Sequence, residues 1–225
     1  QALGVKAVVD TLLQIGHGMA QRGGGAWQST MRAGRPAVAV VSLRAAARCP
    51  LRGARLYAWR MAIPTLLIVY HSLTDGTRQM AQAAFEGALA EPGVAVRLLH
   101  ARDADASAVL AAQGYVFATP ENLAAISGVM KDFFDRSYYS ALDRINGRPY
   151  ASLVCAGSDG SNAARQIARI ATGWRLKAIA EPLIVCTHAQ TPEAIAATKH
   201  LSADALAPCR QLGEAMATGL ALGVF

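Results

Sequence analysis

The chain has 225 residues, of which 53% are hydrophobic and 16% charged, and this composition excludes a chain that is disordered throughout. No apolar run reaches the roughly 20 residues that a membrane-spanning helix needs. The four cysteines form no CxxC pair and no Cys/His cluster; they are Cys49, Cys155, Cys186 and Cys209. Their spacing argues against a disulfide framework and against a metal site, and it indicates a reducing compartment such as the cytoplasm.

The net charge of +7 lies entirely in residues 1–60, where nine Lys/Arg face one acid, a net of +8. Residues 61–225 hold the other 13 Lys/Arg and 14 Asp/Glu, a net of −1, which argues against nucleic-acid binding by this main part. We expect residues 1–60 to be a basic Gly/Arg-rich extension, largely disordered and translated ahead of the natural start near Met61. A transit peptide and a basic arm for nucleic acid or membrane are the alternatives.

Residues 61–225 alternate between strand and helix patterns. The unbroken apolar run 63–70 predicts a strand buried on both faces of a parallel sheet. Strands are predicted at residues 63–70, 94–98, 115–119 and 150–156, with two pieces of a last strand at 176–179 and 183–186. Helices are predicted at residues 77–90, 104–112, 128–142, 163–172 and 202–222, with a short helix after Thr191-Pro192.

Three residues are expected to set boundaries of these elements. Pro120 should end the third strand, and Gly173 should follow the helix over 163–172 as its C′ residue. Pro208 predicts either a kink in the last helix or a later start.

The alternation of five strands with helices predicts one doubly wound α/β domain over residues 61–225. In such folds, ligands bind beyond the carboxyl ends of the strands, where the strand order reverses. Three loops of polar or small residues leave those ends, at 71–77, 120–127 and 157–162. We therefore expect the functional site to be formed by these three loops.

The first loop has the composition of a phosphate-binding site. Hydroxyl groups stand at Ser72, Thr74 and Thr77, and the free N–H groups of a helix start follow them. The loop is neither a Walker A motif nor a GxGxxG dinucleotide turn. A Ser/Thr-rich helix cap without a ligand is the alternative interpretation.

With the three loops taken together, the chain resembles the flavodoxin-like FMN proteins, especially their NAD(P)H-dependent oxidoreductases of the quinone-reductase type. The family pattern S-x-T-G-x-T after the first strand is matched by residues 72–77, and the likeness continues through 119–123, 127–136 and 155–160. It covers nearly all of residues 61–225. The resemblance implies a five-stranded parallel sheet in the order 2-1-3-4-5, with helices on both faces.

The resemblance also implies which residues bind FMN. They are Ser72, Leu73, Thr74, Asp75, Gly76 and Thr77 in the first loop, Thr119, Pro120, Glu121, Asn122 and Leu123 in the second, and Ala156, Gly157, Ser158, Asp159 and Gly160 in the third. Asp75 stands where the family usually has Gly. Because a carboxylate near a phosphate dianion weakens binding, we expect weaker FMN binding than is usual in the family. Alternatively, Asp75 points outward and caps the helix N-terminus.

The activity implied by the resemblance is hydride transfer from NAD(P)H through bound FMN to a quinone or similar small acceptor. Carrier flavodoxins tend to be acidic and to cover the flavin with aromatic side chains. Here the domain is nearly neutral, and residues 119–127 and 156–162 contain no Trp, Tyr or Phe. This favours a reductase whose donor and acceptor share one site in alternation. A flavodoxin-type electron carrier that binds FMN without oxidising NAD(P)H itself is the alternative.

A third possibility, an interaction domain that has lost its flavin, is less favoured. The resemblance implies a homodimer or homotetramer, because a partner chain often completes the open flavin site in this family.

The sequence assigns no catalytic acid or base. Glu121 and Asp159 lie in flavin loops, where they can bond backbone or ribityl groups. His71 is expected to be a structural hydrogen-bonding residue, and His188 a loop residue that could approach the edge of the site.

Outside the loops, Cys155 and Cys186 are expected to be small buried apolar residues. Arg136 and Arg144 could attract the 2′-phosphate of NADPH from a neighbouring subunit, although no sequence pattern requires it.

Overall fold

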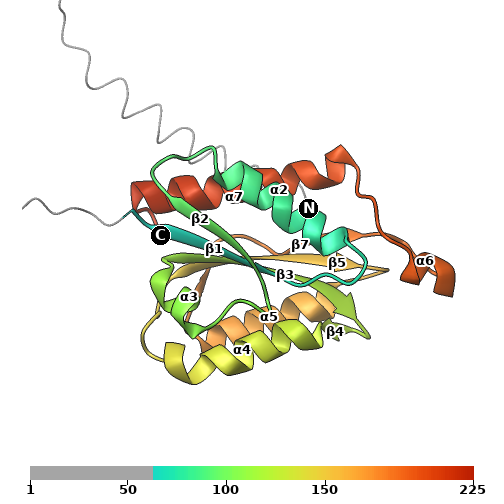
Figure 1. Ribbon diagram of the computed structural model, residues 1–225, viewed down its shortest axis with the longest axis horizontal. Coiled ribbons are helices and arrows are strands. Elements are labelled where there is room, and N and C mark those ends of the chain that lie inside the picture. Colours follow the sequence, from blue (N-terminus) through green and yellow to red (C-terminus); the bar gives the residue numbers. More distant parts are fainter. Residues whose placement is uncertain (1–62) are drawn as a thin grey trace, which may run out of the picture.

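A parallel sheet in the order β2-β1-β3-β5-β6 forms the centre of the computed structural model, which describes residues 63–225 (Figure 1). The strands are β1 (Thr65–Tyr70), β2 (Ala95–His100), β3 (Gly114–Asn122), β5 (Pro149–Ala156), β6 (Lys177–Ala178) and β7 (Leu183–Cys186). Both β6 and β7 pair with β5. The predicted order 2-1-3-4-5 is confirmed, and the fifth position is shared by the two predicted pieces. The expectations for residues 1–60 lie outside the described residues.

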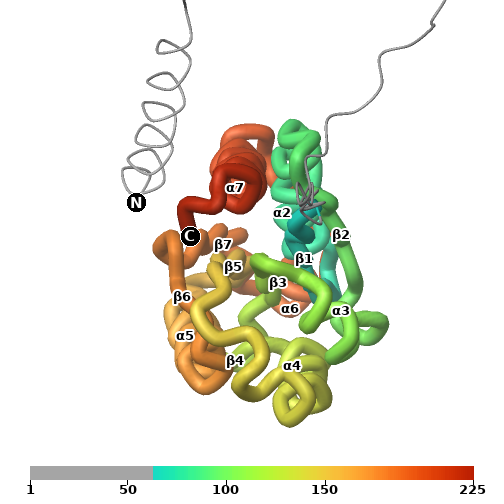
Figure 2. The backbone as a smooth tube through the Cα atoms, turned by 90° about the vertical axis from the view of Figure 1, so that its left-hand side faces the viewer, coloured from blue at the N-terminus to red at the C-terminus, as the bar shows by residue number. Residues whose placement is uncertain are grey.

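Helices cover both faces of the sheet, as the two perpendicular views show (Figures 1 and 2). One face carries α2 (Gly76–Ala88) and α7 (Ala203–Leu222), and the other carries α3 (Ala106–Ala111), α4 (Gly128–Ala141) and α5 (Ser161–Gly173). The short helix α6 (Pro192–Ala196) lies beyond the ends of the strands (Figure 1). None of the helices within residues 63–225 is both long and apolar enough to cross a bilayer.

The apolar run that predicts the first strand is divided between two cores. Leu67 and Val69 pack with the aromatic residues under α4 and α5. Leu66 and Ile68 pack with α2 and α7 on the opposite face. All four side chains are fully buried, and burial of each such side chain stabilises the fold by roughly 1.5–3 kcal/mol. The central position of β1 holds the loop that follows it at the middle of the sheet edge.

The prediction that Pro120 ends the third strand is wrong. Strand β3 continues to Asn122 and turns back into β4 (Ala125–Ile126), which pairs with it antiparallel and was not predicted. Strand β1 stops at Tyr70, opposite Ala118. Beyond that point β3 has a parallel neighbour only on the β5 side, and an edge position of this kind tolerates proline.

The two helix-boundary expectations also need correction. Gly173 is the last residue of α5, and Arg175 adopts the left-handed conformation instead, with φ of 57°. Helix α7 starts at Ala203, with Ser202 as its N-cap, and contains Pro208. The later start is therefore wrong, because the Ser202 hydroxyl accepts the Ala205 N–H and fixes the first turn.

Candidate functional site

The loops that follow β1, β3 and β5 line one cleft of about 300 Å³ at the carboxyl edge of the sheet. From these loops, the lining residues are Ser72, Leu73, Thr74, Thr77, Pro120, Glu121, Asn122, Cys155, Ala156 and Gly157. The chain order 2-1-3-4-5 reverses between β1 and β3, which is the position where open α/β sheets bind ligands. The structure thus brings members of all three predicted loops to one cavity.

Seven of the residues implied to bind FMN lie beside or beneath this cleft instead of lining it. They are Asp75, Gly76, Thr119, Leu123, Ser158, Asp159 and Gly160.

The first loop ends in a helix N-terminus that carries an unsatisfied hydroxyl. The side chain of Thr77 is 1% exposed, and its Oγ1 has no hydrogen-bond partner among residues 63–225. A buried hydroxyl without a partner is unfavourable, and a ligand oxygen would satisfy it. The preceding Gly76 is packed so closely that an added Cβ would lie 2.5 Å from Cys155 Sγ.

Asp75 is the N-cap residue of α2, but its side chain makes no capping bond. Its backbone is left-handed, with φ of 72°, a conformation that favours glycine. Arg78 forms an ion pair with the carboxylate and donates from Nη2 to Oδ2 at 2.8 Å. These hydrogen bonds hold the pKa of Asp75 below its ordinary value. The carboxylate is thus directed toward Arg78, and it does not cap the helix.

The second and third loops are joined by Glu121. Its Oε2 accepts the N–H of Gly160 at 2.8 Å, and its Oε1 accepts the N–H of Ala163 at 3.4 Å. Gly160 is the N-cap residue of α5. The carboxylate therefore occupies the positive end of this helix and fixes the spacing of the two loops across the cleft.

The β3–β4 hairpin is held against α5 from its other side. The amide of Asn162 donates to the carbonyl of Ala124, and Gln166 Oε1 accepts the N–H of Ile126 at 3.1 Å. At the tip, Leu123 and Ala124 both have positive φ, 50° and 59°. A two-residue turn of this kind usually carries Asn or Gly, and here it presents a fully exposed Leu123.

A fourth segment, which sequence reasoning missed, completes the cleft. Its lining residues come after β7 and are Thr187, Ala189, Ile195, Ala196 and Lys199. Strand β7 is parallel to β5, so its carboxyl end reaches the same edge as the other three. The rule that located the first three loops could therefore have located this one.

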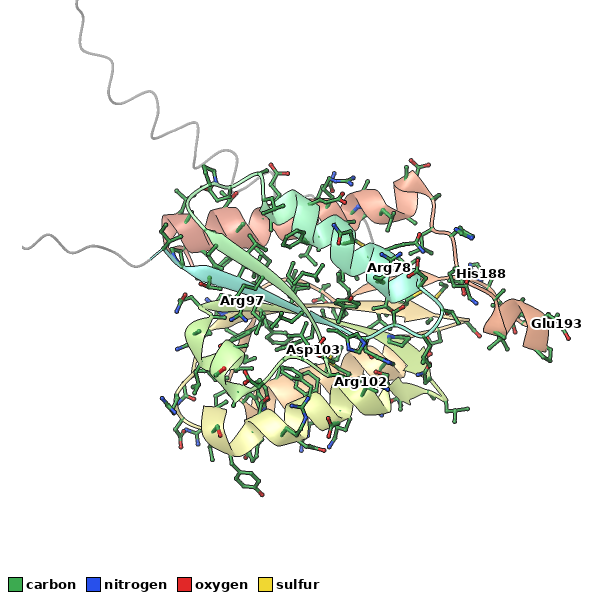
Figure 3. The ribbon with its side chains drawn as sticks, viewed as in Figure 1. Arg78, Arg97, Arg102, Asp103, His188 and Glu193 are labelled. Carbon is green, nitrogen blue, oxygen red and sulfur yellow. The ribbon has the colours of Figure 1, made fainter. Side chains whose placement is uncertain are left out.

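The candidate histidines have different surroundings. His188 is exposed and stands between two residues that line the cleft, but it does not line it. In Figure 3, His188 lies between Arg78 on the body of the molecule and Glu193 at its right-hand tip. His71 is buried beside His100. Burial, followed by the charges of His100 and Arg102, lowers the pKa of His71. The Nδ1 of His71 has no partner within residues 63–225.

The expected burial is confirmed for Cys155 and is wrong for Cys186. Cys155 is buried, and burial raises the pKa of its thiol to about 11, so this group stays protonated near neutral pH. Cys186, by contrast, is only partly buried, and its thiol lies 3.3 Å from the carbonyl oxygen of Ser158. The guanidinium of Arg136 forms an ion pair with Asp132 and donates to the backbone carbonyls of Ala101 and Ala104. Its hydrogen-bonding groups thus already have partners within the chain.

The residues of this cleft are chemically suited to FMN. The Thr77 hydroxyl, which has no partner within residues 63–225, lies next to Ser72 and Thr74 at the start of α2 and suits a phosphate group. Pro120–Asn122 and Ala156–Gly157 form the walls beside it, and together with α6 they can enclose a planar ring system.

Comparison with protein families gives a match over residues 64–191 to a family described as NADPH-dependent FMN reductase. This match spans more than half of the chain. A flavodoxin from Aquifex aeolicus is 34% identical over 93 residues, which are 41% of this chain and 48% of that protein. The chain thus spans about half the length of this curated relative.

Solved structures with the same fold include a flavodoxin from the domain Archaea, with a TM-score of 0.57 at 18% identity over 69% of this chain and 98% of that one. A flavodoxin, WrbA-like protein from Agrobacterium tumefaciens has a TM-score of 0.54 at 19% identity over 70% and 97%. An oxidoreductase from Corynebacterium diphtheriae has a TM-score of 0.52 at 19% identity over 72% and 98%. These similarities establish the flavodoxin-like fold.

Proposed function

Because the chain belongs to the family of NADPH-dependent FMN reductases, we propose that it transfers electrons from NAD(P)H by way of FMN to a quinone or a similar small acceptor. When bound, FMN supplies the redox chemistry, accepting a hydride from the nicotinamide and passing electrons on. The observation that carries the proposal is the convergence of three loops on one cleft beside the unpartnered Thr77 hydroxyl.

In this proposal, the chain binds and orients the cofactor. Ser72, Thr74 and Thr77 hold the phosphate with their hydroxyls and with the N–H groups of the α2 N-terminus. Residues 120–122 and 156–157 position the ring. Glu121 keeps these two walls at a fixed distance, because its carboxylate is bonded to the N–H of Gly160.

The cleft also has a wall suited to a second planar molecule. Leu73, Ala189, Ile195 and Ala196 contribute small or aliphatic side chains to it. A reduced nicotinamide and a quinone can each contact such a surface, and they would do so in alternation at one site. This arrangement favours a ping-pong order of reaction.

The test is a visible spectrum of the purified full chain, before and after titration with FMN. The proposal predicts bands near ~370 and ~450 nm that bleach when NADPH or NADH is added. With a quinone present, NAD(P)H oxidation should continue, and double-reciprocal plots at several quinone concentrations should be parallel. The absence of bands and of any interaction with added FMN would overturn the proposal.

The likeness to flavodoxins favours a second candidate, an electron carrier that binds FMN but does not oxidise NAD(P)H itself. The same experiment separates the two functions. A carrier would show the flavin bands and would be reduced by dithionite or a separate reductase, while NADPH and NADH alone would leave the bands unchanged.

We also propose that a second copy of the chain covers the cleft in a homodimer or homotetramer. Leu73 and Leu123 expose most of their side chains beside the cleft, and burial of such groups favours association. Light scattering coupled to size-exclusion chromatography tests this proposal, and a monomer at micromolar concentration would contradict it.

A further inference from the structure

Helix α6 lines the cleft although it has no buried residue of its own. Ile195 and Ala196 face the cavity, yet none of the five residues of α6 is buried. A short helix of this kind gains little stability from packing or from its own backbone bonds. Its position over the cleft therefore depends on the segments on either side of it. Before it, Gln190 Nε2 donates to Ser158 Oγ at 3.3 Å, and after it come residues 197–201, which we term the strap.

The side chain of Gln79 binds the strap on both sides of His200. Its Nε2 donates to the carbonyl of Lys199 at 2.6 Å, and its Oε1 accepts the N–H of Leu201 at 3.0 Å. One amide thus pairs with two backbone groups of the strap, as a neighbouring strand would. Gln79 stands in the first turn of α2, two residues after Thr77.

Lys199 connects the strap to α6 and to the phosphate loop. Its backbone N–H donates to the carbonyl of Thr74 at 2.7 Å. Its ammonium group donates to the carbonyls at the end of α6, those of Ala194, Ile195 and Ala197, at 2.6–2.9 Å. Capping by a cation satisfies the free carbonyls at a helix C-terminus. Helix α6, the strap and the phosphate loop are therefore joined at Lys199.

We propose that Gln79 is a positioning residue that holds the strap, and through it α6, over the cofactor cleft, and so slows the release of FMN. The inference rests on the proposed FMN site and adds a residue that is not among those lining the cleft. Without the Gln79 amide, the strap keeps its hydrogen bond to Thr74 and the packing of Leu201 against the core, but it loses two hydrogen bonds to α2, and α6 would move away from the cleft more often.

The test measures the rate of FMN release from the full chain by the recovery of free-flavin fluorescence after dilution. Gln79→Ala should release FMN roughly five- to thirtyfold faster than the unaltered chain, since two hydrogen bonds of ordinary net strength correspond to about thirtyfold. Gln82→Ala is the matched control on the same helix, because the side chain of Gln82 makes a single hydrogen bond within residues 63–225, to Glu86 at 3.4 Å. The control should release FMN at the unaltered rate.

A double-mutant cycle separates positioning from a general loss of stability. Lys199→Met should also speed release, and the variant that combines it with Gln79→Ala should be no faster than the faster single variant, because both act through the strap. The Tm of each FMN-free variant is recorded beside its release rate.

Three results would overturn the inference. They are release from Gln79→Ala within twofold of the unaltered rate, independent multiplication of the two effects, and faster release that simply follows a lower Tm. If the unaltered chain binds no FMN, the proposed function fails with it. If that chain binds FMN and the cycle fails, only the role of the strap is rejected.

Discussion

Asp75 combines a charge and a backbone conformation at the phosphate loop, and two substitutions separate their effects. Asp75→Gly removes the carboxylate and also suits the left-handed φ of 72°. Asp75→Asn removes the carboxylate but keeps a side chain that adopts this conformation about as readily as Asp does. The difference between the unaltered chain and Asp75→Asn therefore measures the effect of the charge. The difference between Asp75→Asn and Asp75→Gly measures the effect of the backbone conformation.

The effect on folding should be small. The ion pair between Asp75 and Arg78 is exposed to solvent and joins residues three apart on α2, so its loss changes the free energy of unfolding little. Relief of the left-handed backbone contributes about 1 kcal/mol in Asp75→Gly, and the greater freedom of glycine in the unfolded chain offsets most of it. We expect the free energy of unfolding to change by less than about 1 kcal/mol in either variant.

The effect on FMN affinity should be larger and favourable. The low pKa of Asp75, caused by hydrogen bonds from Arg78, keeps the carboxylate ionised at neutral pH. Arg78 offsets part of its repulsion of a phosphate dianion. Removal of the remaining repulsion should lower the Kd for FMN about three- to tenfold in both variants, which is up to about 1.4 kcal/mol. Arg78→Ala should have the opposite effect, because it leaves the Asp75 carboxylate uncompensated.

Fluorescence titration of FMN at low and high salt measures these changes. An electrostatic effect should shrink as salt is raised, since exposed charges are screened. Equal Kd values for the unaltered chain, Asp75→Asn and Asp75→Gly would refute the role assigned to the charge. Tighter binding by Asp75→Gly alone would assign the effect to the backbone.

Three other changes test the site and the fold. Thr77→Val removes a buried hydroxyl without a partner among the described residues. The affinity for FMN should fall about tenfold, while the Tm of the FMN-free chain should stay the same or rise. A lower Tm would contradict this. Glu121→Ala removes the acceptor of the Gly160 N–H and should lower the free energy of unfolding by about 1–2 kcal/mol, read as a lower Tm by circular dichroism. Burial lowers the pKa of His71 in the folded chain below its ordinary 6.5. Below about pH 6.5 the unfolded chain therefore binds a proton at this histidine more readily than the folded chain does. The free energy of unfolding should accordingly fall as the pH falls. Denaturant titration at pH 7.5 and 5.5 should show a smaller loss in His71→Asn than in the exposed control His188→Asn, and equal losses would count against His71.

The parallel sheet and its order could be predicted because they depend on local patterns. The run at 63–70 is apolar apart from Thr65, which is typical of a strand buried on both faces. The polar loops at 71–77 and 157–162 each follow such a strand, and the parallel arrangement carries their positions to one edge. In the structure the strands pair in parallel, and residues of both loops line the same cleft, as the sequence indicates.

The turn of the β3–β4 hairpin has no comparable local signal. Leu123 and Ala124 adopt positive φ without the Asn or Gly that normally marks such a turn. What holds them is α5, through Asn162 and Gln166, about 40 residues later in the chain. Since tertiary contacts determine this conformation, no reading of residues 119–127 alone could have identified it.

Helix α6 extends the same reasoning to the functional site. None of its residues is buried, so no packing against the core fixes its position. The strap that places it is bound by Gln79, 120 residues earlier than Lys199. Gln79 itself stands in the first turn of the helix that begins at the phosphate loop. The contact that positions the cleft's last wall thus starts from the element that would hold the phosphate, so the strap and phosphate binding should be coupled.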